Sequence, residues 1–217
     1  MARAKRKAGG AETDKLDLYK LHKDQYVKPK TPVLVTVPAV PYLAIDGQGP
    51  PAGETFQARI GGLYGTAFTL KFQSKFAGRD YKVCHLEGLY WGGEGAVGFV
   101  ELPREQWRWT LLIRVPDFIG AEDVEQAKAA LREKGKPPDF EAVRLETLEE
   151  GPCVQVLHVG PCADEPASLE QMRQLAEDEG LVFHARHHEI YLSDPRRVAP
   201  ERMRTILRVP VRPRGEA

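Results

Sequence analysis

Residues 107–116 read WRWTLLIRVP and residues 203–211 read MRTILRVPV, and these two stretches decide the fold of the 217-residue chain. Both are rich in the aromatic and branched side chains that favour strands, and both contain Arg-Val-Pro. Each follows a shorter apolar run that carries one glutamate, HLEGLYW at 85–91 and HHEIYLS at 187–193. The same pair of strands therefore occurs twice, which indicates an internal duplication.

Each strand pair is preceded by the same three elements. Residues 33–49 and 153–160 are rich in strand-forming side chains, and each segment ends at a Gly-Pro turn. Apolar residues at spacings of three and four then predict helices over 54–70 and 168–179. Because duplicated units commonly pack about a twofold axis, we predict an α+β fold of two βαββ repeats related by a pseudo-twofold axis. A ligand cleft is expected at the seam between them.

The repeats also set the expected boundaries. Residues 1–15 are charged and lack apolar periodicity, which is typical of a disordered tail, and residues 16–217 are expected to form one domain. Within that domain we expect repeat one at about 33–116, a helical connector at 117–150 and repeat two at 151–212.

The composition excludes several classes of protein. Thirty-one basic residues balance thirty-one acidic ones, so the chain lacks the positive field that attracts nucleic acid. No apolar run approaches the roughly 20 residues that cross a bilayer, so no membrane partner is expected. Three cysteines without a CxxC spacing indicate neither a disulfide framework nor a zinc site. We therefore expect a cytoplasmic protein without a cofactor, as a monomer or a homodimer.

Glu87 and Glu189 lie inside predicted strands, where a carboxylate is unexpected because strands disfavour Glu and a buried charge must be paired. With a period of two, Glu87 shares a face with Trp91, and Glu189 shares one with Tyr191. One interpretation is an exposed position, or an ion pair with an arginine of a neighbouring strand. The other is a functional pair beside aromatic rings, which could neutralise a cationic ligand or activate a water molecule.

Two further features have structural interpretations. Trp107 and Trp109 lie on one strand face, so both can belong to the core, and at most one is expected to line a cleft. His187, His188 and Glu189 lack a further ligand at a known metal-site spacing, so we expect no metal.

Several longer motifs together point to a known family. They are YKLHKDQYV, PYLAIDGQGPP, GGLYGTAFTLKF, LEGLYW, WRWTLLIRVPDF, GPCVQVLHVGPCADEP and HHEIYLSDPRR, and the likeness that they carry covers about residues 17–211. With these motifs the chain resembles the GyrI-like small-molecule-binding proteins, stand-alone relatives of the ligand domain in multidrug-sensing transcription regulators. The resemblance implies two βαββ units around a ligand cleft with a glutamate at its floor, which the regulators use to bind lipophilic cations.

Some stand-alone members, the cyclopropanoid cyclopropyl hydrolases, open cyclopropane-bearing DNA-alkylating natural products and so detoxify them. The resemblance implies catalytic roles for Glu189 and Glu87. Tyr90 and Cys162 depart from the pattern, where a Trp and a Tyr are common, so the substrate can differ. We expect a hydrolase of this kind acting on a small planar aromatic molecule; the alternative is a protein that only sequesters lipophilic or cationic aromatic compounds. The implied aromatic walls of the ligand cleft are Tyr64, Trp91, Trp109 and Tyr191.

Overall fold

The computed structural model describes residues 15–51, 53–94 and 97–215. Its strands are β1 (Val33–Val37), β2 (Val40–Gln48), β3 (Glu87–Trp91), β4 (Arg108–Arg114), β5 (Arg144–Leu148), β6 (Gly151–Val159), β7 (Leu181–Phe183), β8 (His187–Tyr191) and β9 (Arg204–Pro213). The α-helices are α1 (Leu18–Leu21), α2 (Glu54–Phe76), α3 (Ala121–Glu133) and α4 (Glu165–Asp178). Short 3-10 helices are η1 (Gly98–Glu101), η2 (Arg104–Gln106), η3 (Pro138–Ala142), η4 (Cys162–Asp164) and η5 (Pro200–Arg202).

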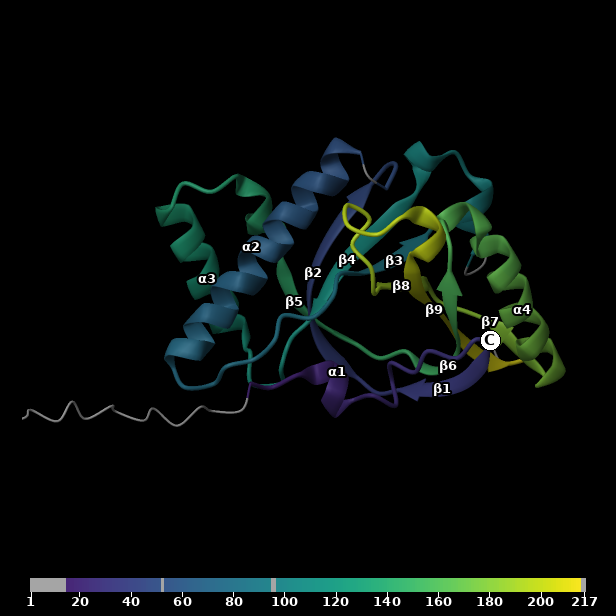
Figure 1. Cartoon of the computed structure of the whole chain (residues 1–217). Helices are drawn as coiled ribbons and strands as arrows, with labels where there is room; N and C mark the ends of the chain where they lie inside the picture. Colours follow the sequence, from purple (N-terminus) through teal and green to yellow (C-terminus); the bar gives the residue numbers. More distant parts are fainter. Residues whose placement is uncertain (1–14, 52, 95–96, 216–217) are drawn as a thin grey trace, which may run out of the picture.

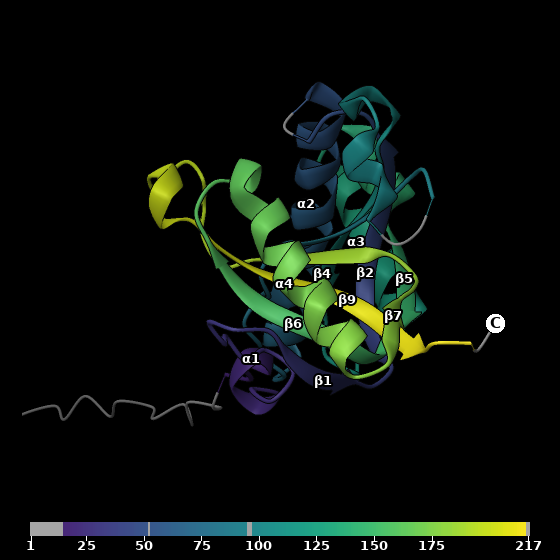
Figure 2. The same ribbon diagram turned by 90° about the vertical axis from the view of Figure 1, so that its right-hand side faces the viewer.

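The strands form one antiparallel sheet built from the two repeats. Its order is β1-β6-β9-β8-β3-β4-β2-β5, and β7 pairs with β9 beside this path. The halves are joined where β3 pairs with β8, and exchanging them reproduces the strand order, so the pseudo-twofold axis passes between these two strands. Helix α2 lies over one half and α4 over the other, while α3 packs outside α2 (Figure 1, Figure 2). The predicted α+β class is confirmed.

The first strand of repeat one crosses to the other half. The extended segment predicted at 33–49 is two strands, because the chain bends at Pro38, in the short link where neither strand is paired. After the bend, β1 pairs with β6 of the second half, whereas β2 pairs with β4 and β5. The segment expected as a helical connector at 117–150 contains α3, and it also supplies β5 to the sheet edge.

Two apolar clusters lie between the sheet and its helices, and both are on the same sheet face. Under α2, the most deeply buried members include Leu43, Ile45, Leu63, Leu70, Leu111 and Ile113. Under α4 they include Val154, Val156, Met172, Ala176, Leu207 and Val209. The expected tail at residues 1–15 lies outside the described residues except for Lys15. Within the described part of the chain, no helix has the length and apolar character needed to cross a bilayer.

Candidate functional site

The pairing of β3 with β8 places Glu87 and Glu189 on opposite faces of the sheet. Gly88 pairs with Glu189, whereas Glu87 pairs with Ile190. Paired residues share a face and neighbours along a strand alternate between faces, so the two glutamates point in opposite directions. The prediction that Glu87 and Glu189 face one ligand together is therefore wrong.

The two glutamates point in opposite directions because they do not occupy equivalent positions in the two repeats. They are offset by one residue. His188 pairs with Arg208, the arginine of the second Arg-Val-Pro. If the pairing of β3 with β4 is continued beyond the end of β3, His85 lies opposite Arg114, the arginine of the first Arg-Val-Pro. His85 therefore corresponds to His188, and the two glutamates do not correspond to each other. A slip of one residue moves every side chain of a strand to the other face.

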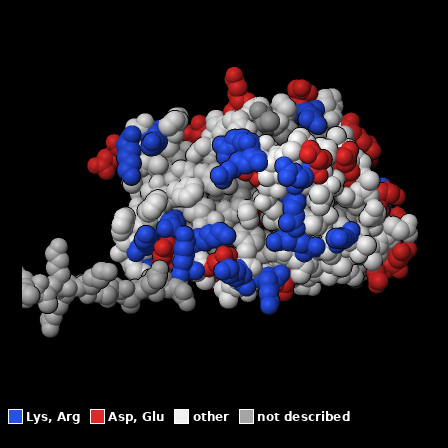
Figure 3. All heavy atoms as spheres, viewed as in Figure 1, with Lys and Arg blue, Asp and Glu red and all other residues white. Residues whose placement is uncertain are grey.

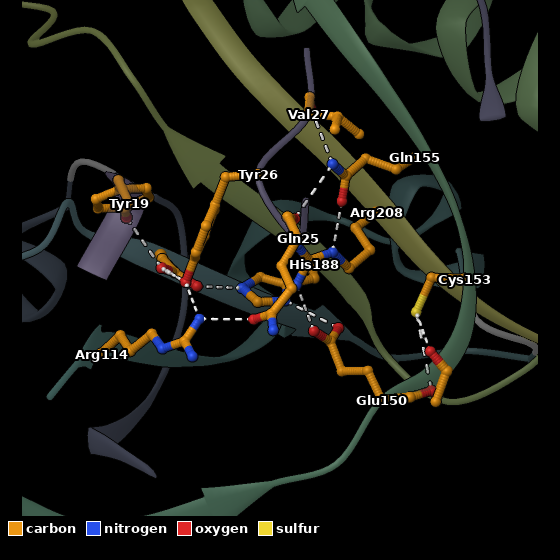
Figure 4. A network of polar contacts seen from close by, with 12 residues as sticks. Tyr19, Gln25, Tyr26, Val27, Arg114, Glu150, Cys153, Gln155, His188 and Arg208 are labelled. Atoms are coloured by element: carbon orange, nitrogen blue, oxygen red, sulfur yellow. Dashed lines mark hydrogen bonds and ion pairs between the residues drawn. The ribbon is translucent and has the colours of Figure 1, made fainter. Parts of the chain in front are cut away.

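Glu87 is fully buried in a polar network on the face opposite α2 and α4 (Figure 4). Its Oε2 lies 3.0 Å from Nε2 of His188, and the Tyr19 hydroxyl donates to its Oε1 over 3.1 Å. Nδ1 of His188 lies 2.9 Å from Glu150, whose second oxygen accepts a 2.6 Å hydrogen bond from Arg208. Glu87 is thus paired with a basic group of a neighbouring strand.

The charges in this network stabilise one another. Burial alone lowers the pKa of His188, but the adjacent Glu150 and Glu87 raise it to about 9. Burial raises the pKa of Glu150, but His188 and Arg208 together lower it to about 2. The His188 imidazolium and the Glu150 carboxylate therefore form a charged cluster at neutral pH. We assign Glu87 to this cluster and not to catalysis.

Glu189 lies on the helix face, between α2 and α4. It pairs with Leu207, which belongs to the apolar cluster under α4. One oxygen or nitrogen from each of Glu165, His187 and Glu189 lies within 4.8 Å of the others, and all three residues are buried. The Nε2 atom of His187 is 3.4 Å from Oε1 of Glu189. Glu165, the first residue of α4, was not predicted; its only sequence signal is an acidic residue at a helix start after a Gly-Pro turn.

The Glu165 carboxyl holds a proton at neutral pH. Burial and the neighbouring Glu189 raise the pKa of Glu165 to about 9, so this carboxyl stays neutral near pH 7. Burial and the same carboxyls raise the pKa of the Cys162 thiol to about 12. We interpret the cluster of Glu165, His187 and Glu189 as an acid–base pair of carboxyls beside an imidazole. His188, which the sequence placed beside His187 and Glu189, points to the opposite face.

Two tyrosines lie beside this carboxyl pair. Tyr191 is two residues beyond Glu189 on the same face, and its hydroxyl is 2.5 Å from that of Tyr90. Gly88 leaves room for them, since a Cβ there would lie 3.1 Å from the Tyr191 hydroxyl oxygen. Tyr64 of α2 and Tyr191 both pack on the apolar cluster under α2. The residues that form what we call the interhelix site are Tyr90, Cys162, Glu165, His187, Glu189 and Tyr191.

Both tryptophans predicted to line the site lie elsewhere. Trp109 is fully buried beneath Phe56, with ring centroids 4.9 Å apart, and its Nε1 donates to the Gly49 carbonyl over 3.0 Å. Trp91 shares the face of Glu87, and the Arg186 guanidinium lies 5.1 Å from its ring centroid. Neither indole therefore belongs to the interhelix site, because β3 presents Trp91 to the other face and α2 covers Trp109. Trp107 is also buried, so both indoles of this strand belong to the core.

An exposed apolar surface lies along α2. Tyr64 stacks on Phe68 with ring centroids 6.0 Å apart, and Phe68, Phe72 and Phe76 are exposed. In Figure 3 white side chains cover this part of the molecule, and basic side chains flank it. Two surface cavities of about 590 and 310 Å³ lie away from this region, and Glu189 lines neither.

Comparison with known proteins identifies the family. A model of the GyrI-like small molecule binding domain matches residues 30–212. The chain belongs to the GyrI-like family. A crystal structure of a hydrolase from Listeria innocua is similar to this GyrI-like chain with 39% identity and a TM-score of 0.81, over 91% of this chain and 100% of that one. A second structure described as a Listeria innocua hydrolase shares 40% identity, with a TM-score of 0.83, over 92% and 100% of the two chains.

More distant similarity extends to the protein EcmrR. The C-terminal domain of EcmrR shares 13% identity with this GyrI-like chain, with a TM-score of 0.51, over 84% of this chain and 97% of that domain. At this identity the similarity shows a common fold alone. A search of curated protein sequences found no match.

Proposed function

We propose that this GyrI-like protein is a hydrolase that opens the strained cyclopropane ring of planar aromatic DNA-alkylating compounds by adding water. The observation that carries the proposal is the buried pair of Glu165 and Glu189 at the interhelix site, in which the raised pKa of Glu165 keeps that carboxyl neutral near pH 7. Two carboxyl groups of unequal protonation are a common arrangement for acid–base chemistry near neutral pH. The two Listeria relatives described as hydrolases support the general reaction class.

In the proposed reaction, Glu189 accepts a proton from water while the neutral Glu165 carboxyl orients the same water molecule through a hydrogen bond. The water oxygen forms a bond to a cyclopropane carbon, and the strained carbon–carbon bond breaks. Its electron pair moves into the conjugated carbonyl of the substrate, which then takes up the proton released by Glu189. The net change is the addition of one water, which removes the alkylating ring.

Aromatic side chains provide the surface for a planar substrate. Tyr191 lies beside Glu189 on the same strand face, and Tyr64 with Phe68 presents stacked rings on α2. Planar aromatic molecules gain from burial against such rings and from offset or edge contacts with them. The proposed binding site therefore combines an apolar surface with a small number of polar groups, as ligand sites commonly do.

The competing function is sequestration of planar aromatic compounds without turnover. The match to a small molecule binding domain favours this second candidate, because binding is the property that the family description names. The two functions differ in one measurable quantity, the number of product molecules formed per protein molecule.

The test is to incubate the protein with an excess of a cyclopropane-bearing duocarmycin-type compound and to follow the ring-opened product over time. We expect product beyond one equivalent, and we expect Glu189→Gln to slow its formation by roughly 100-fold or more. Glu170→Gln, an exposed position on α4, is the matched control and should keep the native rate. Product that is absent or stops at one equivalent, with tight binding retained, would refute the hydrolase and support sequestration.

A further inference from the structure

A second pocket lies on the sheet face opposite the interhelix site, beside α1. Its volume is about 310 Å³, which is within the lower range of small-molecule sites. Tyr19 and Tyr26 line it, and their hydroxyls donate to Glu87 in the buried network. Figure 4 shows both tyrosines in that network. The charged and titratable side chains that line the pocket are Asp17, Lys20, Lys23, Lys28, Lys82 and His85.

Four ammonium groups therefore meet a single carboxylate in this pocket. That carboxylate, Asp17, is already engaged, because it accepts the backbone N–H groups of Tyr19 and Lys20 and lies 3.5 Å from Nζ of Lys82. The three remaining lysines, Lys20, Lys23 and Lys28, form no ion pair with any carboxylate of residues 15–51, 53–94 and 97–215. In Figure 3 basic side chains gather over α1 and the adjoining end of α2.

His85 adds a hydrogen-bond donor to this pocket. Its ring packs edge-on against Tyr19, with centroids 4.9 Å apart. Burial and the positive charge of Lys82 lower the pKa of His85, so the imidazole is neutral near pH 7 and carries one N–H. A bound anion would offset the charge of Lys82 and favour the protonated imidazole.

We propose that this pocket binds a small organic anion that carries a phosphate or carboxylate group. The cluster of ammonium groups supplies the attraction, and the tyrosine rings with Leu192 supply an apolar wall for the body of the ligand. The pocket is separated from Glu189 by the sheet, so its ligand is distinct from the substrate of the carboxyl pair. This site goes beyond the proposed hydrolase and does not depend on it.

The experiment titrates pyrophosphate and, separately, citrate into the full chain at constant ionic strength, with heat of binding and the NMR titration of His85 as readouts. We expect saturable binding of at least one anion and a higher pKa of His85 in its presence. The double variant Lys20→Gln/Lys28→Gln should weaken binding about tenfold. The matched control Lys134→Gln/Lys136→Gln changes two exposed lysines at the end of α3 and should bind as the native protein does.

Binding of pyrophosphate alone would identify the recognised group as a phosphate, and binding of citrate alone would identify a carboxylate. Three results would overturn the proposal: saturation by neither anion, equal weakening in the two double variants, or an unchanged pKa of His85 at saturation. Because both double variants keep the interhelix site intact, the ring-opening assay remains a separate measurement.

Discussion

Replacing Glu165 with glutamine is expected to stabilise the folded protein while impairing its chemistry. The raised pKa of Glu165 means that the folded protein binds one more proton than the unfolded chain between about pH 4.5 and pH 9. Stability from this group is therefore fully present below pH 4.5 and is lost as the pH rises toward 9. At ~1.4 kcal/mol per pH unit, the loss reaches about 3 kcal/mol at pH 7. Glutamine keeps the shape of the neutral acid and removes this loss.

The assay is urea unfolding of the native protein and Glu165→Gln at pH 5, 7 and 8.5. Because Glu165 and Glu189 each keep 7% of their surface exposed, water partly solvates the pair, and we expect a gain of roughly 1–3 kcal/mol at pH 7. The gain should grow at pH 8.5 and nearly vanish at pH 5. Glu170→Gln, exposed on the same helix, should show no such trend. If the difference in unfolding free energy between the variant and the native protein is independent of pH, or falls as the pH rises, the raised pKa of Glu165 is refuted.

Three further substitutions and titrations test the assignment of the other residues. Glu87→Gln should lower the free energy of unfolding by roughly 2–4 kcal/mol, because it weakens a buried ion pair. The ring-opening rate of the folded fraction should not change. A large loss of that rate in stably folded protein would instead indicate that Glu87 is catalytic. The His188 imidazole should titrate near pH 9 when followed by NMR. Its contribution to stability should therefore be complete below pH 6.5 and be lost as the pH rises through 9. Titration near pH 6.5 would contradict the charged network. Trp109→Phe should lower the free energy of unfolding by roughly 1–3 kcal/mol, because ring area and the hydrogen bond to Gly49 are lost. Its affinity for the substrate should not change. Weaker substrate binding at unchanged stability would indicate that the indole lines the binding site.

The architecture was accessible from the sequence because it depends on local patterns that occur twice. The periodicity of α2 and the two Arg-Val-Pro strands each identify an element within a short window, and their repetition supplies the duplicated fold. The short edge strands β5 and β7 were missed, since RLETL and LVF are too brief to show a period. Pro38 was compatible with a bend, but no local sequence feature predicts that β1 pairs with β6 in the other half of the sheet.

The site was only partly accessible because it depends on register and on long-range contact. Glu189 was found as an acidic residue inside a strand, and the ion-pair interpretation of Glu87 was also available. Which of the two faces the helices depends on a single-residue offset between β3 and β8, which a comparison of similar motifs cannot resolve. Glu165 reaches Glu189 only because α4 packs with its first turn over β8, and Trp109 leaves the site because α2 covers it.

The central claim is that water from solvent, activated by the Glu165–Glu189 pair, opens the substrate ring in repeated turnovers. The most direct test is to run the reaction with excess cyclopropane-bearing compound in H₂¹⁸O and to measure the masses of product and protein. The account predicts several equivalents of ring-opened product, each with one ¹⁸O on the opened carbon, and protein of unchanged mass. Product limited to one equivalent, or protein that gains the mass of the compound at Cys162 or another nucleophile, would contradict it.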